Sequence, residues 1–550
     1  MPVRIPSEQH ETVVSVLREA ARVNGAVEAY VEPDAGAGRR SLTFAAWDRA
    51  ADGVAGHLAR LGVVKGDVVC LLLPSCIDYA VLYAALLRLG AITSGINPRM
   101  GAGEVASIVD RAAPVLLVVD PAASPPPDAG AAATVTRDET RGWWGGEGPG
   151  SWPELAASDP VAVVWTSGTT GRPKGAVFDH ANLAAVARGT DVLSHPGDRR
   201  LSPLPFAHVG YMTRAWDEIG NAVTTVITPT PWRADQAVRV MADEAVTVAQ
   251  GVPTQWALVL ASEELARADL STLRVAGTGA ARMTAAMVAE VRRRVGVPVV
   301  VRYTSTESSL GTGTTLHSSD EEVATTVGRP VAGVELSIVD DEGRPVPDGA
   351  VGRVLLRSAA VMRGYWGRGP GRGRPVAELL DAPATRTVLA PDGWLTTGDF
   401  GRLTPQGNLQ LSGRAHERYV RGGYNVYPAE VEEALSSHPA VERAAVVGVA
   451  DDVLGEVGVA VVVATAGTQP ELAELRAHCA RQLSDYKAPD ALVLVDELPL
   501  TPMMKVDPVR LAALAARGAE ERRQRLQSRR PGSGVLGSGP TGEAEEKERA

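Results

Sequence analysis

The segment at residues 166–174 brings hydroxyl groups, glycines and a lysine close together. It follows the apolar run at residues 161–164, so we expect a buried strand to lead into it. Glycines let backbone N–H groups approach an anion closely, hydroxyls donate further hydrogen bonds, and Lys174 adds positive charge. These groups predict a loop that binds the phosphates of ATP or a similar polyphosphate. A Walker A loop is disfavoured, because Gly175 follows the lysine where that motif needs Ser or Thr.

A second polar group follows the β-branched run that begins at residue 299. Thr306 and Glu307 lie just beyond this predicted strand, and open α/β sheets bind their ligands at such strand ends. Mg²⁺ prefers oxygen ligands and is held on phosphates through one or two carboxylates. Glu307 is therefore a candidate metal ligand.

A third candidate is Asp399, which closes the segment Gly-Trp-Leu-Thr-Thr-Gly-Asp at residues 393–399. A carboxylate can accept two hydrogen bonds from neighbouring hydroxyls, which is how a ribose diol presents them. Gly398 leaves room for a sugar beside it. We therefore expect Asp399 to bind the ribose of a nucleotide.

Five segments, in this order along the chain, resemble the signature motifs of the adenylate-forming superfamily. That superfamily includes acyl- and aryl-CoA synthetases, luciferases and the adenylation domains of peptide synthetases. The resemblance covers about residues 40–510 and rests on residues 165–175, 299–307, 393–399, 411–432 and 498–507. It implies ATP, Mg²⁺ and CoA as cofactors or co-substrates, and a carboxylic acid as the small-molecule partner.

The resemblance also implies roles for individual residues. ATP-binding roles fall on Thr166, Ser167, Gly168, Thr169, Thr170, Gly171, Lys174, Gly279, Ala280, Tyr303, Asp399 and Arg414. Catalytic roles fall on Lys505, Thr306, Glu307 and His208, with Glu307 also the metal ligand. Within these sets, Tyr303 packs against adenine, and Arg414 binds the ribose or a phosphate.

Lys505 and His208 are expected beside the reacting acid. When a carboxylate attacks the α-phosphate two anions approach, so a flexible ammonium between them stabilises the developing charge. Lys505 is expected to supply that ammonium. His208 lies in a Pro-Phe-Ala-His-Val-Gly segment, at residues 205–210, that resembles the family's gate beside the acid; an ordinary core histidine is the equally weighted alternative.

Three positions depart from the superfamily pattern. Thr304 and Met504 replace glycines, and His416 replaces the usual Asp or Lys at the interdomain hinge. A missing glycine restricts φ and adds bulk, so the local turns are expected to differ. An imidazole titrates near neutrality, which would make a pivot at His416 sensitive to pH; a tolerated polar residue in an exposed hinge is the simpler interpretation.

Composition fits a large cytoplasmic enzyme. The chain has 550 residues, of which 45% are hydrophobic, so at least two domains are expected. A formal charge of −10 argues against a nucleic-acid partner. Three dispersed cysteines indicate a reduced compartment without a disulfide framework. We expect no secretory signal or membrane span, and the oligomeric state is either a monomer or a homodimer.

Alternating β-branched runs and helical patterns predict an α/β fold. We expect a large N-terminal domain, residues 1–415, with mixed, mostly parallel sheets sandwiched by helices. A small mobile α+β C-terminal domain follows at residues 416–515. Residues 516–550 mix charge runs with Gly-Ser-Gly sequence and are expected to be disordered.

The expected reaction is ATP- and Mg²⁺-dependent activation of a carboxylic acid to an acyl-adenylate, followed by transfer to the CoA thiol with release of AMP and pyrophosphate. The alternative within the fold uses another acceptor, either a carrier-protein thiol or an amine- or nitrite-type condensation. Two further alternatives are a binding-only homologue and an ATP hydrolase. An α-amino acid substrate is disfavoured, because Ala207 stands near the place where amino-acid-activating relatives carry an aspartate.

Overall fold

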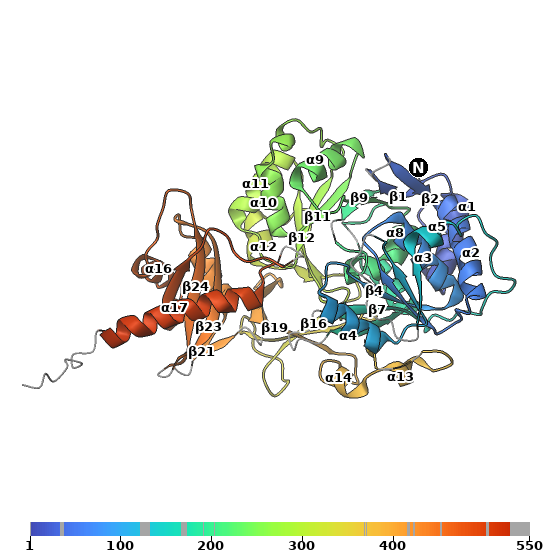
Figure 1. Ribbon diagram of the computed structural model, residues 1–550. Coiled ribbons are helices and arrows are strands. Elements are labelled where there is room, and N and C mark those ends of the chain that lie inside the picture. Colours follow the sequence, from blue (N-terminus) through green and yellow to red (C-terminus); the bar gives the residue numbers. More distant parts are fainter. Residues whose placement is uncertain are drawn as a thin grey trace, which may run out of the picture. The chain divides into compact units, whose positions relative to one another are not determined.

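The structure is a computed structural model that describes residues 2–33, 38–121, 132–166, 173–190, 192–202, 204–367, 369, 371–414, 418–421, 424–451, 454–501 and 505–528. The chain divides into two compact units (Figure 1). The larger comprises Met1–His416 with Leu500–Lys505, and the smaller comprises Glu417–Pro499 with Val506–Ala550. The segment that carries Lys505 therefore groups with the larger unit, whereas the sequence placed it in the small domain.

Three sheets form the larger unit. The nine-stranded sheet has the order β15 (Arg329–Pro330), β14 (Thr312–Gly313), β13 (Val299–Tyr303), β12 (Val275–Gly279), β11 (Val248–Gly251), β9 (Arg199–Ser202), β10 (Thr224–Ile227), β1 (Glu28–Glu32), β2 (Arg40–Thr43). The seven-stranded sheet has the order β18 (Gly364–Tyr365), β8 (Lys174–Asp179), β7 (Pro160–Thr166), β4 (Ile92–Ile96), β3 (Val68–Leu72), β5 (Leu116–Val119), β6 (Ala133–Thr136). The four-stranded sheet has the order β16 (Glu335–Val339), β17 (Gly352–Arg357), β19 (Leu395–Leu403), β20 (Leu409–Arg414).

Parallel pairing dominates the two large sheets, and antiparallel strands lie at their edges. The run from β13 to β1 is parallel throughout, while β2 and β14 pair antiparallel to it. The run from β7 to β6 is also parallel, and β8 pairs antiparallel with β7. The expected α/β class with mixed, mostly parallel sheets is confirmed.

Helices cover these sheets. Those of the larger unit are α1 (Val13–Val23), α2 (Phe44–Arg60), α3 (Ile77–Leu89), α4 (Ala102–Ala112), α5 (Arg137–Arg141), α6 (His180–Gly189), α7 (Val209–Met212), α8 (Ala215–Gly220), α9 (Ala234–Asp243), α10 (Pro253–Ala261), α11 (Ala285–Val295), α12 (Asp320–Thr325), α13 (Val376–Leu379) and α14 (Ala382–Arg386), with 3-10 turns η1 (Ser7–Gln9) and η2 (Glu263–Ala266). Figure 1 shows α9 to α12 gathered beside β11 and β12. All 13 residues of α3 are buried, including Asp78 and Arg88, which fits a helix whose apolar residues are not confined to one face.

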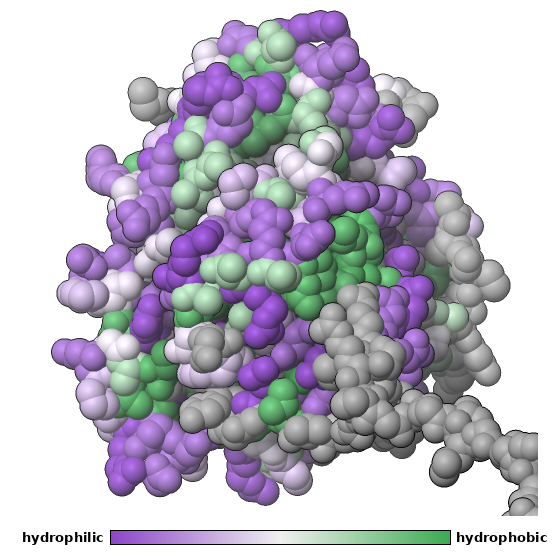
Figure 2. All heavy atoms as spheres, turned by 90° about the vertical axis from the view of Figure 1, so that its left-hand side faces the viewer, coloured by the Kyte–Doolittle hydropathy of each residue, from purple (hydrophilic) through white to green (hydrophobic). Residues whose placement is uncertain are grey.

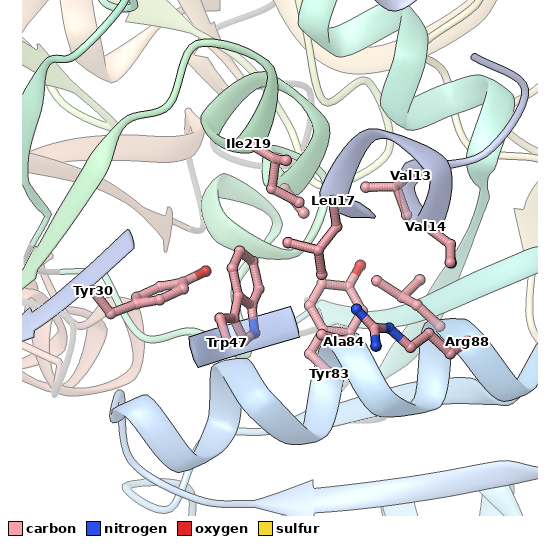
Figure 3. Close-up of a pocket in the computed structure, with 11 residues that line it drawn as sticks. Val13, Val14, Leu17, Tyr30, Trp47, Tyr83, Ala84, Arg88 and Ile219 are labelled. Atoms are coloured by element: carbon pink, nitrogen blue, oxygen red, sulfur yellow. The ribbon is translucent and has the colours of Figure 1, made fainter. Parts of the chain in front are cut away.

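The core between α1, α2 and α3 is close-packed around one small gap (Figure 3). Leu17, Trp47 and Tyr83 point into it, and Arg88 closes one side with ion pairs to acidic residues of α2. Its volume is near 10 Å³, which is room for about one water molecule. This gap is too small for an organic substrate.

The smaller unit is a sheet between two helical layers. Its strands are β22 (Tyr424–Val426), β21 (Tyr419–Arg421), β24 (Gly455–Ala464), β23 (Val441–Asp451) and β25 (Ala491–Leu494). Its helices are α15 (Pro428–Ser436), α16 (Leu472–Cys479) and α17 (Pro508–Ser528), with the turn η3 (Asp485–Lys487). Side chains of α15 and α16 share one apolar cluster with the sheet, and side chains of α17 share the other. The sequence expectation of a small α+β domain agrees with this unit.

The expectation of disorder from residue 516 is wrong for residues 516–528. These residues continue α17, and Ala519 is buried against the sheet. Arg522 also binds Asp451, with 2.6 Å between Nη1 and Oδ2. The charged residues Glu520, Glu521 and Arg523 lie on the exposed side of this helix. Residues 529–550 lie outside the described part of the chain.

Candidate functional site

The phosphate-loop candidate connects two paired strands. Thr166 ends β7, Lys174 begins β8, and these two residues are register partners in an antiparallel pair. The intervening Ser167, Gly168, Thr169, Thr170 and Gly171 lie outside the described residues. Lys174 Nζ is 5.0 Å from the centre of the Tyr365 ring, so its ammonium faces an aromatic surface.

Glu307 lies in the turn that follows β13, as expected for the end of a parallel strand. Its carboxylate accepts a hydrogen bond from the Tyr365 hydroxyl, 2.8 Å from Oε1. Its backbone carbonyl accepts from the Met362 N–H at 2.9 Å. Glu307 and Thr306 are both half-buried. The carboxylate is thus held at a fixed place at the edge of the nine-stranded sheet.

Tyr303 and Asp399 form a direct pair. The Tyr303 hydroxyl lies 2.5 Å from Asp399 Oδ2, although the two residues stand 96 positions apart. Asp399 is only 7% exposed. It lies on β19, where its register partner on β20 is Arg414. The structure therefore brings the expected adenine residue, the ribose residue and the backbone of Arg414 to one place.

Gly279 ends β12, where it pairs with Arg302 of β13, and Ala280 follows it. A Cβ on Gly279 would lie 2.7 Å from the carbonyl oxygen of Arg302, so only glycine fits at this strand contact. Ala280 has φ of +68°, a left-handed conformation that side chains rarely adopt. A tight turn therefore leads from β12 toward the region expected to hold the nucleotide.

His208 caps the short helix α7. Its Nδ1 accepts a hydrogen bond from the Gly210 N–H at 3.1 Å, which puts the proton of the neutral ring on Nε2. Burial lowers the pKa of His208 to about 4, and the positive charge of Lys505 acts in the same direction. Lys505 is exposed and its backbone is tied to Thr501. At neutral pH the imidazole is therefore uncharged.

Tyr365 is the residue of this region that sequence reasoning missed. It lies on β18, which pairs with β8 next to Lys174. Its contacts to Glu307 and Lys174 depend on the fold, and no spacing rule marks it. In the sequence, only the neighbouring Gly364 and Trp366 indicated a buried segment. In the structure Trp366 is indeed 1% exposed.

Comparison with known proteins agrees with this geometry. The family model described as AMP-binding enzyme matches residues 17–366, and the one described as AMP-binding enzyme C-terminal domain matches residues 430–505. A long-chain-fatty-acid–CoA ligase of Mycobacterium tuberculosis is 30% identical over 506 residues, covering 89% of this chain and 96% of that protein. The chain therefore belongs to the AMP-binding enzyme family, and it is an enzyme of the acid–thiol ligase class.

Two further relatives differ in the reactions that their names give. An indoleacetate–CoA ligase of Aromatoleum aromaticum is 32% identical over 494 residues, covering 87% of this chain and 94% of that protein. The structure of the amide bond synthetase McbA from Marinactinospora thermotolerans superposes with a TM-score of 0.76 at 27% identity, covering 91% of this chain and 99% of that chain. These two proteins are thus named for different products, a CoA conjugate and an amide.

Proposed function

We propose that this enzyme joins a carboxylic acid with an apolar or aromatic body to the thiol of CoA. The acid first attacks the α-phosphate of ATP, which gives an acyl-adenylate and pyrophosphate. The thiol then displaces AMP. The observation that carries the proposal is the set of polar contacts on neighbouring strands and turns of the larger unit, in a chain that matches CoA ligases over nearly nine-tenths of its length.

ATP binding would use groups from all three sheets of the larger unit. Lys174 and the hydroxyls of residues 166–170 suit the phosphates, because an ammonium and O–H donors both favour anions. Asp399 would accept from the ribose diol, and the Tyr303 hydroxyl holds that carboxylate in place. The Tyr303 ring then supplies a flat apolar surface for the adenine base.

The described residues suit a magnesium ion bound together with ATP. Glu307 offers carboxylate oxygens, and Mg²⁺ is usually bound by one or two carboxylates plus phosphates and waters. No group of three or more His, Cys, Asp or Glu side chains gathers into a metal cage within the described residues. The ion would neutralise phosphate charge while the acid attacks.

Lys505 and His208 would act on the incoming acid. The Lys505 ammonium stabilises negative charge that develops as the carboxylate and the α-phosphate approach each other. The neutral His208 ring can donate from Nε2 to the carboxylate without adding a competing positive charge. Activation replaces a poor leaving group with AMP, so thiol attack becomes feasible in the second step.

A different acceptor is the second candidate function. The amide bond synthetase shares the fold over almost its full length, so an amine could replace the thiol without a change of architecture. The first half-reaction would be the same in both cases. Only the second half-reaction separates the two candidates.

The test is a pyrophosphate-release screen over fatty, aryl and arylacetic acids. Acid-dependent release of pyrophosphate, followed by AMP and thioester formation only when CoA is present, is the expected result. Amide formation from an added amine in place of the thioester would favour the second candidate. ATP hydrolysis that needs no acid would contradict both.

We further propose a cytoplasmic enzyme. The three cysteines, Cys70, Cys76 and Cys479, are all unpaired and buried, as suits a reducing compartment. Among the described helices none combines the length and apolar character that a bilayer crossing needs. Figure 2 shows hydrophilic residues over most of one face, with smaller hydrophobic areas between them.

The oligomeric state is a separate question. Light scattering would decide between monomer and homodimer.

A further inference from the structure

Tyr365 lies between the two charged side chains that the proposed function assigns to ATP and its metal ion. Strand β18 adds to the edge of the seven-stranded sheet, with Tyr365 opposite Ala176 on β8. The Arg363 guanidinium fixes the strand further by binding Asp179 at 2.5 Å. Tyr365 itself is 3% exposed. Its ring is thus held rigidly by the strand that Lys174 begins.

One tyrosine side chain contacts both charges at once. Its hydroxyl donates to Glu307 Oε1 at 2.8 Å, and its ring face lies 5.0 Å from Lys174 Nζ. Because an ionised carboxylate only accepts hydrogen bonds, the Tyr365 hydroxyl is the donor in this contact.

The ring also keeps opposite charges apart. Lys174 and Glu307 make no direct ion pair with each other in the described part of the chain. A direct pair would neutralise both groups before ATP arrives, and it would have to be broken for each nucleotide bound. An aromatic face holds a cation more weakly than a phosphate does, so Lys174 can transfer to a phosphate at little cost.

Resting on the proposed function, we propose that Tyr365 is a positioning residue for ATP and magnesium binding. Its hydroxyl orients the Glu307 carboxylate toward the metal ion. Its ring separates Lys174 from Glu307 and keeps the ammonium available to the phosphates. A carboxylate has about four lone-pair sites, so the hydrogen bond from Tyr365 leaves Glu307 capacity to bind a cation.

Two substitutions separate the two roles. Tyr365→Phe retains the ring and removes the hydroxyl, whereas Tyr365→Leu removes both. The matched control is Tyr83→Phe, because the Tyr83 hydroxyl is equally buried and donates to the Met212 carbonyl at 2.7 Å in the same unit. Calorimetric titration of each full-length protein with ATP, with and without Mg²⁺ and in the absence of acid, measures binding without turnover.

Tyr365→Phe is expected to bind metal-free ATP as tightly as the wild type does. The factor by which Mg²⁺ increases the affinity for ATP should be about 10-fold smaller in this variant, because one hydrogen bond to a charged group is lost. Tyr365→Leu is expected to lose that gain and also about 5-fold in metal-free ATP affinity. Tyr83→Phe is expected to lower the melting temperature with no change in either affinity.

An unchanged magnesium gain in Tyr365→Phe, or the same loss in Tyr83→Phe, would overturn the role of Tyr365. Because the wild type is titrated in parallel, this failure is distinct from failure of the proposed function. In that second case the wild type itself binds no ATP.

Discussion

Lys505 is the residue on which the first half-reaction depends most in the proposed mechanism. Its charge is already felt at His208, whose pKa it helps to lower. We expect Lys505→Ala to reduce acyl-adenylate formation by at least about 10²-fold, because one preorganised electrostatic contact is lost. Thioester formation from presynthesised acyl-adenylate should change much less. Equal losses in the two half-reactions, measured by separate single-turnover assays, would contradict the assignment.

His180 is a buried histidine whose protonation affects the stability of the fold at acid pH. It is fully buried, its Nδ1 accepts from the Val13 N–H, and its Nε2 has no hydrogen-bond partner within the described residues. Burial lowers the pKa of His180 to about 4; the charge of Asp159 opposes this shift and that of Lys65 adds to it. The unfolded chain therefore binds a proton near pH 6.5, and the folded chain does so only near pH 4.

The contribution of His180 to the unfolding free energy is accordingly fully present above about pH 6.5, and it is lost as the pH falls toward 4. The shift corresponds to at most about 3 kcal/mol of unfolding free energy. We expect His180→Gln to be less stable than the wild type at pH 7 and to lose less stability between pH 6.5 and 4.5. Urea unfolding at several pH values measures how the unfolding free energy of each protein changes with pH. The same pH dependence in the variant and the wild type would exclude a role for His180.

At the scale of elements, α17 is the part whose importance only the structure reveals. Leu511, Ala515 and Ala519 are buried against the sheet of the smaller unit, and Arg522 binds Asp451. We expect truncation after residue 528 to leave the melting temperature unchanged. Truncation after residue 518 should destabilise the smaller unit by about 1–2 kcal/mol, because it removes a buried methyl group and a partly buried ion pair.

Differential scanning calorimetry of the two truncations tests this expectation, with Arg522→Gln as the control that removes the ion pair alone. Equal melting temperatures for the full chain and for the version that ends at residue 518 would show that the last turns of α17 contribute no stability.

At the scale of the whole molecule, we propose that the two units rearrange between the two steps of the reaction. The division of the chain falls after His416. Proline fixes φ near −65° and removes a donor, so His416→Pro would restrict a pivot at that residue. We expect near-normal acyl-adenylate formation and strongly impaired thioester formation, measured separately, with His416→Ala as the flexible control. Normal turnover in the proline variant would place the pivot elsewhere.

The sequence by itself determined the family and the α/β class, and it supplied most of the residues proposed for the site. These inferences rest on contiguous segments: a glycine- and hydroxyl-rich loop after an apolar run, and a carboxylate that follows a strand. Local chemistry of this kind follows from residue type and near spacing alone. In the structure Glu307 accordingly follows the end of β13, while Lys174 begins β8 and Asp399 lies within β19.

Only the tertiary structure decided which of these groups meet. Tyr365 reaches Glu307 across 58 positions, and Tyr303 reaches Asp399 across 96, through strands that belong to different sheets. The sequence also misjudged residues 516–528, because whether a charged segment orders depends on an apolar surface elsewhere that can bury one side of it. Side-chain pairing and burial are properties of the packed chain, so no local pattern contains them.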